Sequence, residues 1–241
     1  MRSPFGIFRY ILSTCAFIFK GVMGIIITID GPAGAGKSTT ARALAEKLGF
    51  DFLDTGAMYR AVALACIRIT QPPFSEDFLT GVVKGLQVRS QAGKVFLDQE
   101  EVTALIRSPE VTRTSGIIAS SESVRKRMVE LQRLSVEGKN VVCEGRDQGT
   151  VAFPKAQCKF FLTADAEARA QRRALENQAN GLQTNLEELI RENQARDDRD
   201  AKRTTGPMVP AADAILLDNS QMDIDQVLAL MEKEIRERCF K

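Results

Sequence analysis

The sequence contains no histidine, and this absence excludes several kinds of catalytic site. Without imidazole there is no Ser–His–Asp triad, no histidine general base and no histidine metal ligand. Cysteine occurs at five positions, but none of them form a C-x-x-C motif. Such cysteines are typical of incidental thiols in a reducing compartment, which predicts a cytoplasmic location. The formal net charge is only +2, which gives no overall electrostatic reason to expect a nucleic-acid or membrane partner.

Hydrophobic runs long enough to cross a bilayer are also missing from the N-terminal part of the chain. The uninterrupted stretch of apolar or small residues from Tyr10 to Phe19 is too short to span a membrane. We interpret residues 1–23 as an N-terminal extension and leave three readings of residues 1–22 open. They are a mis-assigned start upstream of a working initiator at Met23, a packed or interfacial helix, or a targeting segment. None of these readings alters the chemistry predicted below.

The chain is organised around a glycine-rich segment near its beginning. Residues 25–29 are nearly all isoleucine, which predicts a strand buried on both faces. The pattern G-x-x-x-x-G-K-S follows directly, and the helix-forming residues 39–48 come next. A strand, a glycine loop and a helix in this order predict a phosphate-binding loop. The alternative is a glycine-rich turn between strand and helix that binds no ligand. The residues expected to hold a nucleoside triphosphate are Gly31, Pro32, Ala33, Gly34, Ala35, Gly36, Lys37, Ser38 and Thr39.

Two of these side chains have specific expected roles. Lys37 is placed to reach the β and γ phosphates, and the Ser38 hydroxyl suits Mg²⁺. The sequence therefore predicts ATP and Mg²⁺ as ligands.

Short apolar segments alternate with helical segments along most of the chain, which predicts an α/β fold. The predicted core is a five-stranded parallel sheet with helices on both faces. Its strands are expected at residues 25–29, 51–53, 141–144, 159–163 and 214–217. A helix is expected from Ala57 to Thr70, and Ser108 followed by Pro109 is expected to begin another. A segment of alternating polarity at residues 86–103 departs from this rhythm and predicts a small antiparallel β-sheet within an insertion.

Polar residues follow three of the predicted strands, at residues 31–38, 54–60 and 144–147. Because the carboxyl ends of parallel strands meet at one sheet edge, a ligand explains these clusters better than solvation does. Four arginines could give forked hydrogen bonds to phosphates, namely Arg60, Arg146, Arg199 and Arg203. Residues 196–203 taken alone also fit a solvated, salt-bridged helix, and a flexible turn follows them, as it would in a hinged flap.

Four motifs in order resemble the bacterial cytidylate kinases, which belong to the P-loop nucleoside monophosphate kinases. They are the glycine loop, D-T-G-A-M-Y-R at 54–60, E-G-R-D-Q-G-T at 144–150, and R-D-D-R-D at 196–200 followed by V-P-A-A-D-A at 209–214. The resemblance runs from about Ile25 to Arg238. It implies transfer of the γ-phosphoryl group of ATP to CMP or dCMP. Nothing in the sequence suggests an obligate interface, so we expect a monomer.

The resemblance also implies roles for individual residues. Lys37, Arg60, Arg146, Arg199 and Arg203 would be catalytic. The acceptor nucleotide would contact Asp54, Thr55, Tyr59, Arg60, Arg125, Arg146, Asp147, Arg196, Asp200 and Arg203. Within this set Arg125 and Asp147 resemble the pair that reads cytosine, and Arg196 and Asp200 resemble the pair that holds the ribose.

One position departs from the family. Gly116 stands where a base-contacting serine is usual, with Ser115 beside it.

The base assignment has a physical logic. A carboxylate accepts a hydrogen bond from the cytosine amino group but opposes the carbonyl that uracil has in its place. An ordinary ion pair between Arg125 and Asp147 is the alternative.

The resemblance further implies a division of the chain. Residues 24–54, 130–189 and 207–241 would form the core, residues 55–129 the acceptor-binding subdomain, and residues 190–206 a helical lid.

Two rival functions remain at this point. One is a P-loop kinase for UMP, AMP or a metabolite such as shikimate. The other is a nucleotide switch, although the N-K-x-D motif of GTPases does not occur.

Overall fold

The computed structural model describes residues 24–239, except for residues 92, 180 and 182; the predicted N-terminal extension therefore lies outside the described residues. Its centre is a five-stranded sheet with the strand order β2-β6-β1-β7-β8. All four neighbouring pairs in this sheet run parallel. The strands are β1 (Ile26–Asp30), β2 (Asp51–Asp54), β6 (Val141–Glu144), β7 (Cys158–Thr163) and β8 (Ile215–Asp218). The predicted five-stranded parallel sheet is confirmed.

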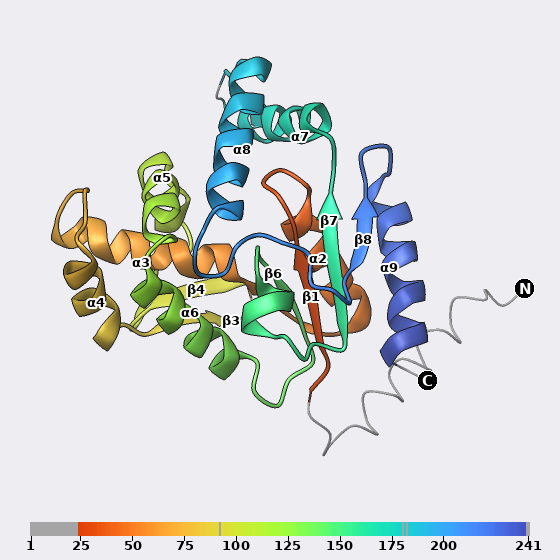
Figure 1. Cartoon of the computed structure of the whole chain (residues 1–241), viewed down its shortest axis with the longest axis horizontal. Helices are drawn as coiled ribbons and strands as arrows, with labels where there is room; N and C mark the ends of the chain where they lie inside the picture. Colours follow the sequence, from red (N-terminus) through yellow and green to blue (C-terminus); the bar gives the residue numbers. More distant parts are fainter. Residues whose placement is uncertain (1–23, 92, 180, 182, 240–241) are drawn as a thin grey trace, which may run out of the picture.

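The sheet is covered by helices on both faces because its strands are apolar on both sides. Ile27 and Ile29 of β1 are fully buried in a cluster with α2 (Lys37–Leu48) and α9 (Ile224–Cys239). On the other face, Val141 and Cys143 of β6 pack with α3 (Thr55–Ile69) and α6 (Glu122–Ser135). This arrangement leaves the carboxyl edge of the sheet for polar residues (Figure 1).

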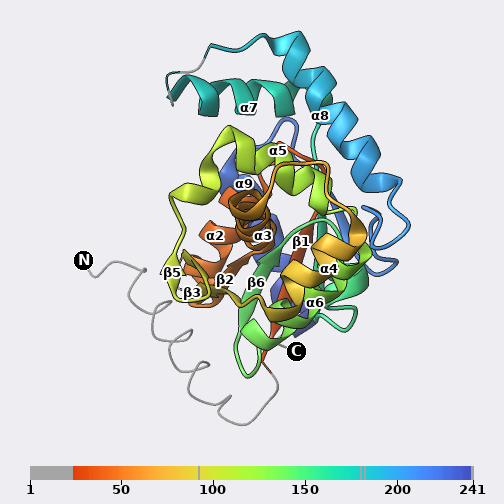
Figure 2. The same ribbon diagram turned by 90° about the vertical axis from the view of Figure 1, so that its left-hand side faces the viewer.

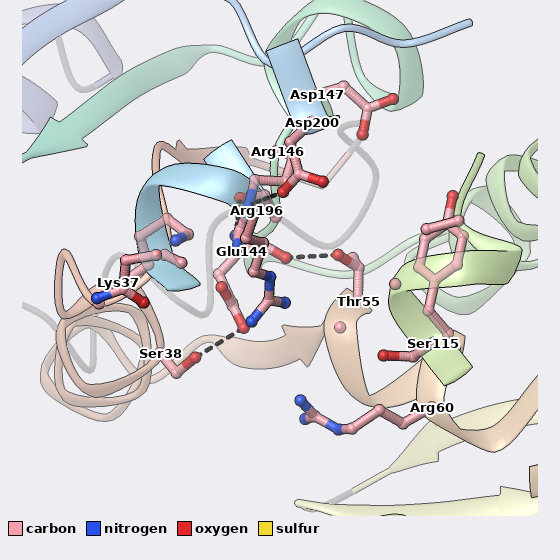
Figure 3. Close-up of a pocket in the computed structure, with 18 of the residues that line it drawn as sticks. Lys37, Ser38, Thr55, Arg60, Ser115, Glu144, Arg146, Asp147, Arg196 and Asp200 are labelled. Atoms are coloured by element: carbon pink, nitrogen blue, oxygen red, sulfur yellow. Dashed lines mark hydrogen bonds and ion pairs between the residues drawn. The ribbon is translucent and has the colours of Figure 1, made fainter. Parts of the chain in front are cut away.

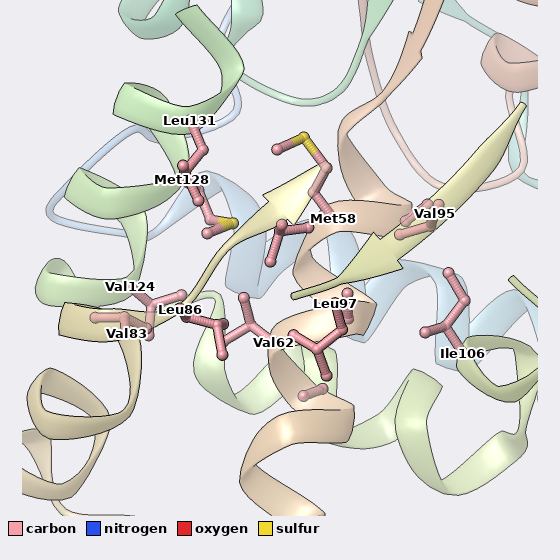
Figure 4. Packing of buried hydrophobic residues seen from close by; sticks show 14 of the residues in the cluster. Met58, Val62, Val83, Leu86, Val95, Leu97, Ile106, Val124, Met128 and Leu131 are labelled. Carbon is pink, nitrogen blue, oxygen red and sulfur yellow. The ribbon is translucent and has the colours of Figure 1, made fainter. Parts of the chain in front are cut away.

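The predicted insertion is present as a three-stranded antiparallel sheet. Its strands are β3 (Val88–Gln91), β4 (Lys94–Leu97) and β5 (Glu100–Glu101). It lies with α4 (Glu76–Gly85), the 3₁₀ turn η1 (Leu105–Arg107) and α5 (Pro109–Ile118) beside the main sheet. Figure 4 shows the apolar packing that joins these parts, in which Met58 and Val62 of α3 lie between Leu97 of β4 and Met128 of α6. The insertion therefore shares one hydrophobic core with β6.

Two further helices cross above the carboxyl edge of the sheet. They are α7 (Ala166–Ala179) and α8 (Leu186–Ala201), and they pack against each other (Figures 1 and 2). Asn185 caps the start of α8, since its Oδ1 accepts a hydrogen bond from the N–H of Glu187 at 2.9 Å. The helix runs without interruption through Arg196 to Ala201.

Two local features differ from the sequence-based expectation. Helix α3 begins at Thr55, two residues before the expected start at Ala57, because the carboxylate of Asp54 caps it by accepting the N–H of Ala57 at 2.7 Å. A π-helical turn, η2 (Gln148–Ala152), follows β6 at a place where no helix was predicted. Within the described part of the chain, no helix combines the length and apolar character needed to cross a membrane.

Candidate active site

A cavity of about 240 Å³ lies at the carboxyl edge of the sheet, between the glycine loop, α3, α5, the end of β6 and α8. Figure 3 shows Lys37 and Ser38 at one end of this pocket, Ser115 at the other, and Glu144 and Arg146 between them. The structure thus brings most of the predicted site residues around a single cavity. Those lining it are Ala33, Gly34, Gly36, Lys37, Ser38, Thr39, Thr55, Tyr59, Arg60, Arg125, Arg146, Asp147, Arg196, Asp200 and Arg203.

The glycine loop forms one wall of the pocket. Gly34 and Gly36 have φ values of 75° and 84°, a left-handed conformation that glycine adopts without strain. Lys37 is the first residue of α2, and its Nζ donates a hydrogen bond to the carbonyl of Pro32 at 2.7 Å. Burial and the nearby Arg146 lower the pKa of Lys37 to about 7. A polyanionic ligand at this position would restore the charged form, because an opposite charge favours it.

Ser38 and Glu144 form a small oxygen-rich group beside the loop. The Ser38 hydroxyl donates to Oε1 of Glu144 at 2.8 Å, and Thr55 Oγ1 donates to the main-chain carbonyl of Glu144 at 2.7 Å. Burial and the neighbouring Asp54 raise the pKa of Glu144 to about 7. Among the described residues there is no group of three or more His, Cys, Asp or Glu side chains that could hold a metal by itself. A hydroxyl and one carboxylate nevertheless fit Mg²⁺, which takes much of its coordination from substrate phosphates and water.

Several guanidinium groups converge on the middle of the pocket. Arg146, just after β6, donates from Nε to Oδ2 of Asp200 at 2.9 Å. Arg203, just after α8, pairs with the other oxygen of Asp200. Arg60 approaches from α3, with Nη2 3.5 Å from Oδ2 of Asp54. Forked cations from three separate elements can contact a phosphate from several sides.

The far end of the pocket contains the pair Arg125 and Asp147. Their side chains are only 3% and 6% exposed and form an ion pair. Burial raises the pKa of Asp147. Cζ of Arg125 lies 5.9 Å from the centre of the Tyr59 ring. Gly206, which follows α8, lies directly over the pair, and a Cβ at this position would overlap both charged groups.

The two residues at the position that departs from the family also line this end of the pocket. Ser115 Oγ donates to the carbonyl of Thr112 within its own helix at 2.8 Å. A Cβ at Gly116 would have no heavy atom within 4 Å, so this part of the wall is open.

Some of the predicted residues do not line the cavity. Asp54 serves as the cap of α3, and Gly31, Pro32 and Ala35 contribute main chain to the loop. Arg199 is exposed, and its Nε donates to the carbonyl of Ala195 one turn earlier in α8.

Residues that the sequence analysis missed hold the glycine loop from outside. Arg169 of α7 forms an ion pair with Asp197 of α8, and both contact the main chain of Ala33. Nη1 of Arg169 donates to the Ala33 carbonyl at 2.9 Å, and Oδ1 of Asp197 accepts the Ala33 N–H at 2.9 Å. Because the pair is 28 residues apart in sequence and binds main-chain atoms, no local pattern marks it. Arg173, Glu176 and Asn193 also line the pocket without having been predicted.

Comparison with known proteins identifies the family. The family model described as cytidylate kinase matches residues 27–237. A cytidylate kinase from Desulfitobacterium hafniense (strain Y51) is 47% identical over 84% of this chain and 88% of its own length. A cytidylate kinase from Thermotoga petrophila is 45% identical over 90% of this chain and 99% of its own length.

Among solved structures, an uncharacterized protein from Eubacterium ventriosum ATCC 27560 has a TM-score of 0.50 at 13% identity, with coverage of 89% of this chain and 99% of that one. This likeness concerns the fold alone. The match over nearly all described residues and the high identity to curated relatives lead to one conclusion: the chain belongs to the cytidylate kinase family.

Proposed function

We infer that this chain transfers the γ-phosphoryl group of ATP to CMP or dCMP, which is the reaction of its family. We further infer that the two nucleotides meet in the pocket between Lys37 and Asp147. The observation that carries this inference is the single cavity that both residues line. A triphosphate site at the glycine loop and a base site at Asp147 therefore lie on one continuous surface. In-line transfer requires this arrangement, because donor and acceptor phosphates must touch.

The acceptor phosphate oxygen is itself the nucleophile in this reaction. It is largely ionised at neutral pH, so no general base is needed, in keeping with the absence of histidine. Catalysis then consists of positioning and charge neutralisation. We assign Lys37 to the donor β and γ phosphates, and Arg60, Arg146 and Arg203 to the acceptor phosphate and the group in transfer. Ser38 and Glu144 would hold Mg²⁺, which when bound supplies positive charge to the phosphate oxygens.

We assign recognition of the cytosine base to Arg125 and Asp147, and of the ribose to Arg196 and Asp200. Support comes from the burial of the Arg125–Asp147 pair at the end of the pocket away from Lys37, with Tyr59 beside it. A carboxylate at this depth can accept from the cytosine amino group without competition from water.

We propose that the segment at residues 190–206 is a lid that closes over both nucleotides and keeps ATP from water. Asp197 contacts the glycine loop, Asp200 contacts Arg146, and Gly206 covers the base-reading pair. One short segment thus contacts the glycine loop, the middle of the pocket and its far end. Lid opening and product release would then limit turnover, as in other enzymes with closing segments.

We place the reaction in the cytoplasm, carried out by a monomer. The described cysteines Cys66, Cys143, Cys158 and Cys239 are free thiols, as expected for a reducing compartment. Light scattering on the purified chain should give the mass of one copy.

The decisive experiment is an ADP-release assay with CMP, dCMP, UMP, AMP and shikimate as acceptors. We expect the highest kcat/KM with CMP or dCMP, and a loss of at least about 10²-fold in kcat for Lys37→Met. Lys47→Met is the matched control, because Lys47 lies on the same helix but is half exposed and pairs with Glu232. A higher rate with AMP or shikimate, or ATP hydrolysis that no acceptor accelerates, would contradict the proposal.

A further inference from the structure

The segment that carries Arg146 and Asp147 is attached to the central strand by a residue with no role assigned so far. Asp30 is the last residue of β1 and is only 5% exposed. Its Oδ1 accepts the N–H of Gln148 at 2.8 Å, and its Oδ2 accepts the N–H of Gly149 at 2.7 Å. Asp30 does not line the nucleotide pocket. Its carboxylate therefore acts on the main chain and has no direct access to a ligand there.

This pair of hydrogen bonds fixes the turn that begins at Asp147. The carbonyl of Asp147 accepts the N–H groups of Val151 and Ala152 at 2.8 and 3.3 Å, which closes the π-helical turn η2. The first N–H groups of such a turn have no partner within it. Asp30 supplies acceptors for two of these groups, on two successive residues. Two hydrogen bonds to the two oxygens of one rigid carboxylate set the orientation of this main chain as well as its position.

The residue at position 149 is also suited to the hydrogen bond with Asp30, because glycine brings the main chain close to β1. A Cβ at this position would lie 3.0 Å from Oγ1 of Thr28 and 3.2 Å from Cδ of Lys159. Both contacts are tighter than ordinary van der Waals contacts, so Thr28 of β1 or Lys159 of β7 would have to shift to admit a methyl group. Glycine lets the main chain approach β1 closely enough for its N–H to reach Asp30 without such a shift.

We propose that Asp30 is a positioning residue for the acceptor nucleotide: it holds the main chain at residues 147–149 so that Asp147 meets the cytosine base. Asp147 is joined directly to Gln148, so a shift of the Gln148 N–H moves the Asp147 carboxylate with it. Base discrimination by hydrogen bonds depends on distances of a few tenths of an ångström. The proposal rests on the assignment of CMP as acceptor given above.

Asp30 is also adjacent to the glycine loop, since Gly31 follows it directly. A residue that acted through the loop would change the use of ATP, whereas one that acts through Asp147 changes the use of the acceptor. The KM values for the two substrates therefore separate the proposal from this alternative.

The test is Asp30→Asn, which keeps the side-chain shape but replaces one accepting oxygen with an amide nitrogen that cannot accept. We expect kcat/KM for CMP to fall by roughly 10- to 100-fold, the effect of one lost hydrogen bond to a charged group. The KM for ATP should stay within about twofold of wild type. The ratio of kcat/KM for CMP to that for UMP should decrease, because a misplaced Asp147 carboxylate weakens binding of the correct base, cytosine, the most. Met231→Ala is the control, because it removes a buried side chain of α9 remote from the pocket and should leave both the KM ratio and the preference unchanged.

Gly149→Ala disturbs the same contact without touching the carboxylate and should give the same pattern, which keeps the test open if Asp30→Asn folds poorly. In an Asp147→Asn background, Asp30→Asn should have little further effect on the base preference, because the two residues act in series. An equal rise in KM for ATP, an unchanged CMP preference, or effects that multiply in the double variant would overturn the proposal. Failure of the function assignment is distinct, since it would appear in the wild-type acceptor panel.

Discussion

Asp147 combines burial, charge and an ion pair with Arg125 at the end of the pocket. A buried carboxylate is costly unless it is paired or hydrogen bonded. The ion pair with Arg125 offsets this free-energy cost, and the Tyr59 ring lies beside the guanidinium. The same features make Asp147 suited to discriminate between bases, because a ligand that leaves its oxygen without a donor pays the cost again.

The change Asp147→Asn tests this role. An amide can donate to the uracil carbonyl, so the preference for CMP over UMP should fall by roughly 10- to 100-fold, the effect of one well-placed base contact. The ratio of kcat/KM values for the two acceptors measures it. Glu100→Gln is the control, because Glu100 pairs with Arg68 on the exposed surface. Retention of the wild-type preference by a folded Asp147→Asn protein would assign base reading to other residues.

Asp30 also predicts a pH dependence of stability. Burial raises its pKa from 3.8 to about 6 in the folded chain, against the lowering effect of its hydrogen bonds to Gly149 and Gln148. Between these two pH values the folded state holds a proton that the unfolded state has released, so this group's contribution to stability decreases as pH rises from about 4 to about 6. Asp30→Asn lacks the titration and should gain up to about 3 kcal/mol relative to wild type over this window. Urea unfolding at pH 4, 5, 6 and 7 measures the difference, and parallel curves would contradict it.

Helix α8 is the element that connects the two halves of the pocket. Asp197 near its middle accepts the N–H of Ala33 in the glycine loop, and Asp200 near its end accepts from Arg146. The spacing of three residues places both carboxylates on one face of the helix. Arg199, between them in sequence, lies on another face and is exposed. The helix periodicity therefore separates Arg199 from the residues that face the pocket.

Arg203 and Arg199 form a matched pair of variants for the lid. Arg203→Ala should lower kcat by on the order of 10²–10³, because Arg203 lines the pocket beside Arg146 and is proposed to supply charge to the phosphates. Arg199→Ala should have a much smaller effect if the arrangement of α8 in this structure is the one that performs the transfer. Single-turnover rates for the two variants give the comparison. Equal losses would mean that α8 moves further toward the nucleotides, and wild-type turnover of Arg199→Ala would remove Arg199 from the catalytic set.

Elements with strong local signals were predictable from the sequence. The isoleucine run gave β1, and Ser108 followed by Pro109 marked the start of α5. The turn η2 was not predictable, because its N–H groups are satisfied by Asp30, which precedes it by 118 residues. The early start of α3 was missed because an aspartate that ends one element and caps the next has no distinct local pattern. Motif residues were predicted where the expected chemistry requires a particular type of side chain. The Arg169–Asp197 pair was missed because it binds main-chain atoms, which leave no sequence pattern.

At the scale of the whole molecule, the described residues that line the pocket all lie between Ala33 and Arg203. A protein that starts at Met23 should therefore keep kcat and both KM values of the full chain within experimental error. Parallel kinetics and calorimetry on the two proteins check this expectation. A loss of activity with unchanged stability would give residues 1–22 a role in the reaction.

The shared hydrophobic core limits how the molecule can move. Met58 and Val62 of α3 and Leu97 of β4 belong to the same buried cluster as Val141 and Cys143 of β6. Opening the insertion as a rigid body would expose this cluster to water, at a cost of about 25 cal/mol for each Å² of apolar surface. The helices α7 and α8 are the more mobile part by this criterion, since few of their side chains are buried.

The position of Gly206 has a consequence for the order of events. Its backbone lies against the two charged groups that would read the base, and it ends the segment that we propose as the lid. If that segment closes over both nucleotides, the pyrimidine diphosphate can leave only after the segment opens, even when phosphoryl transfer is complete. Departure of both products would then be a single gated event, so lengthening the tether at residues 204–207 should uncouple their exit rates in stopped-flow measurements.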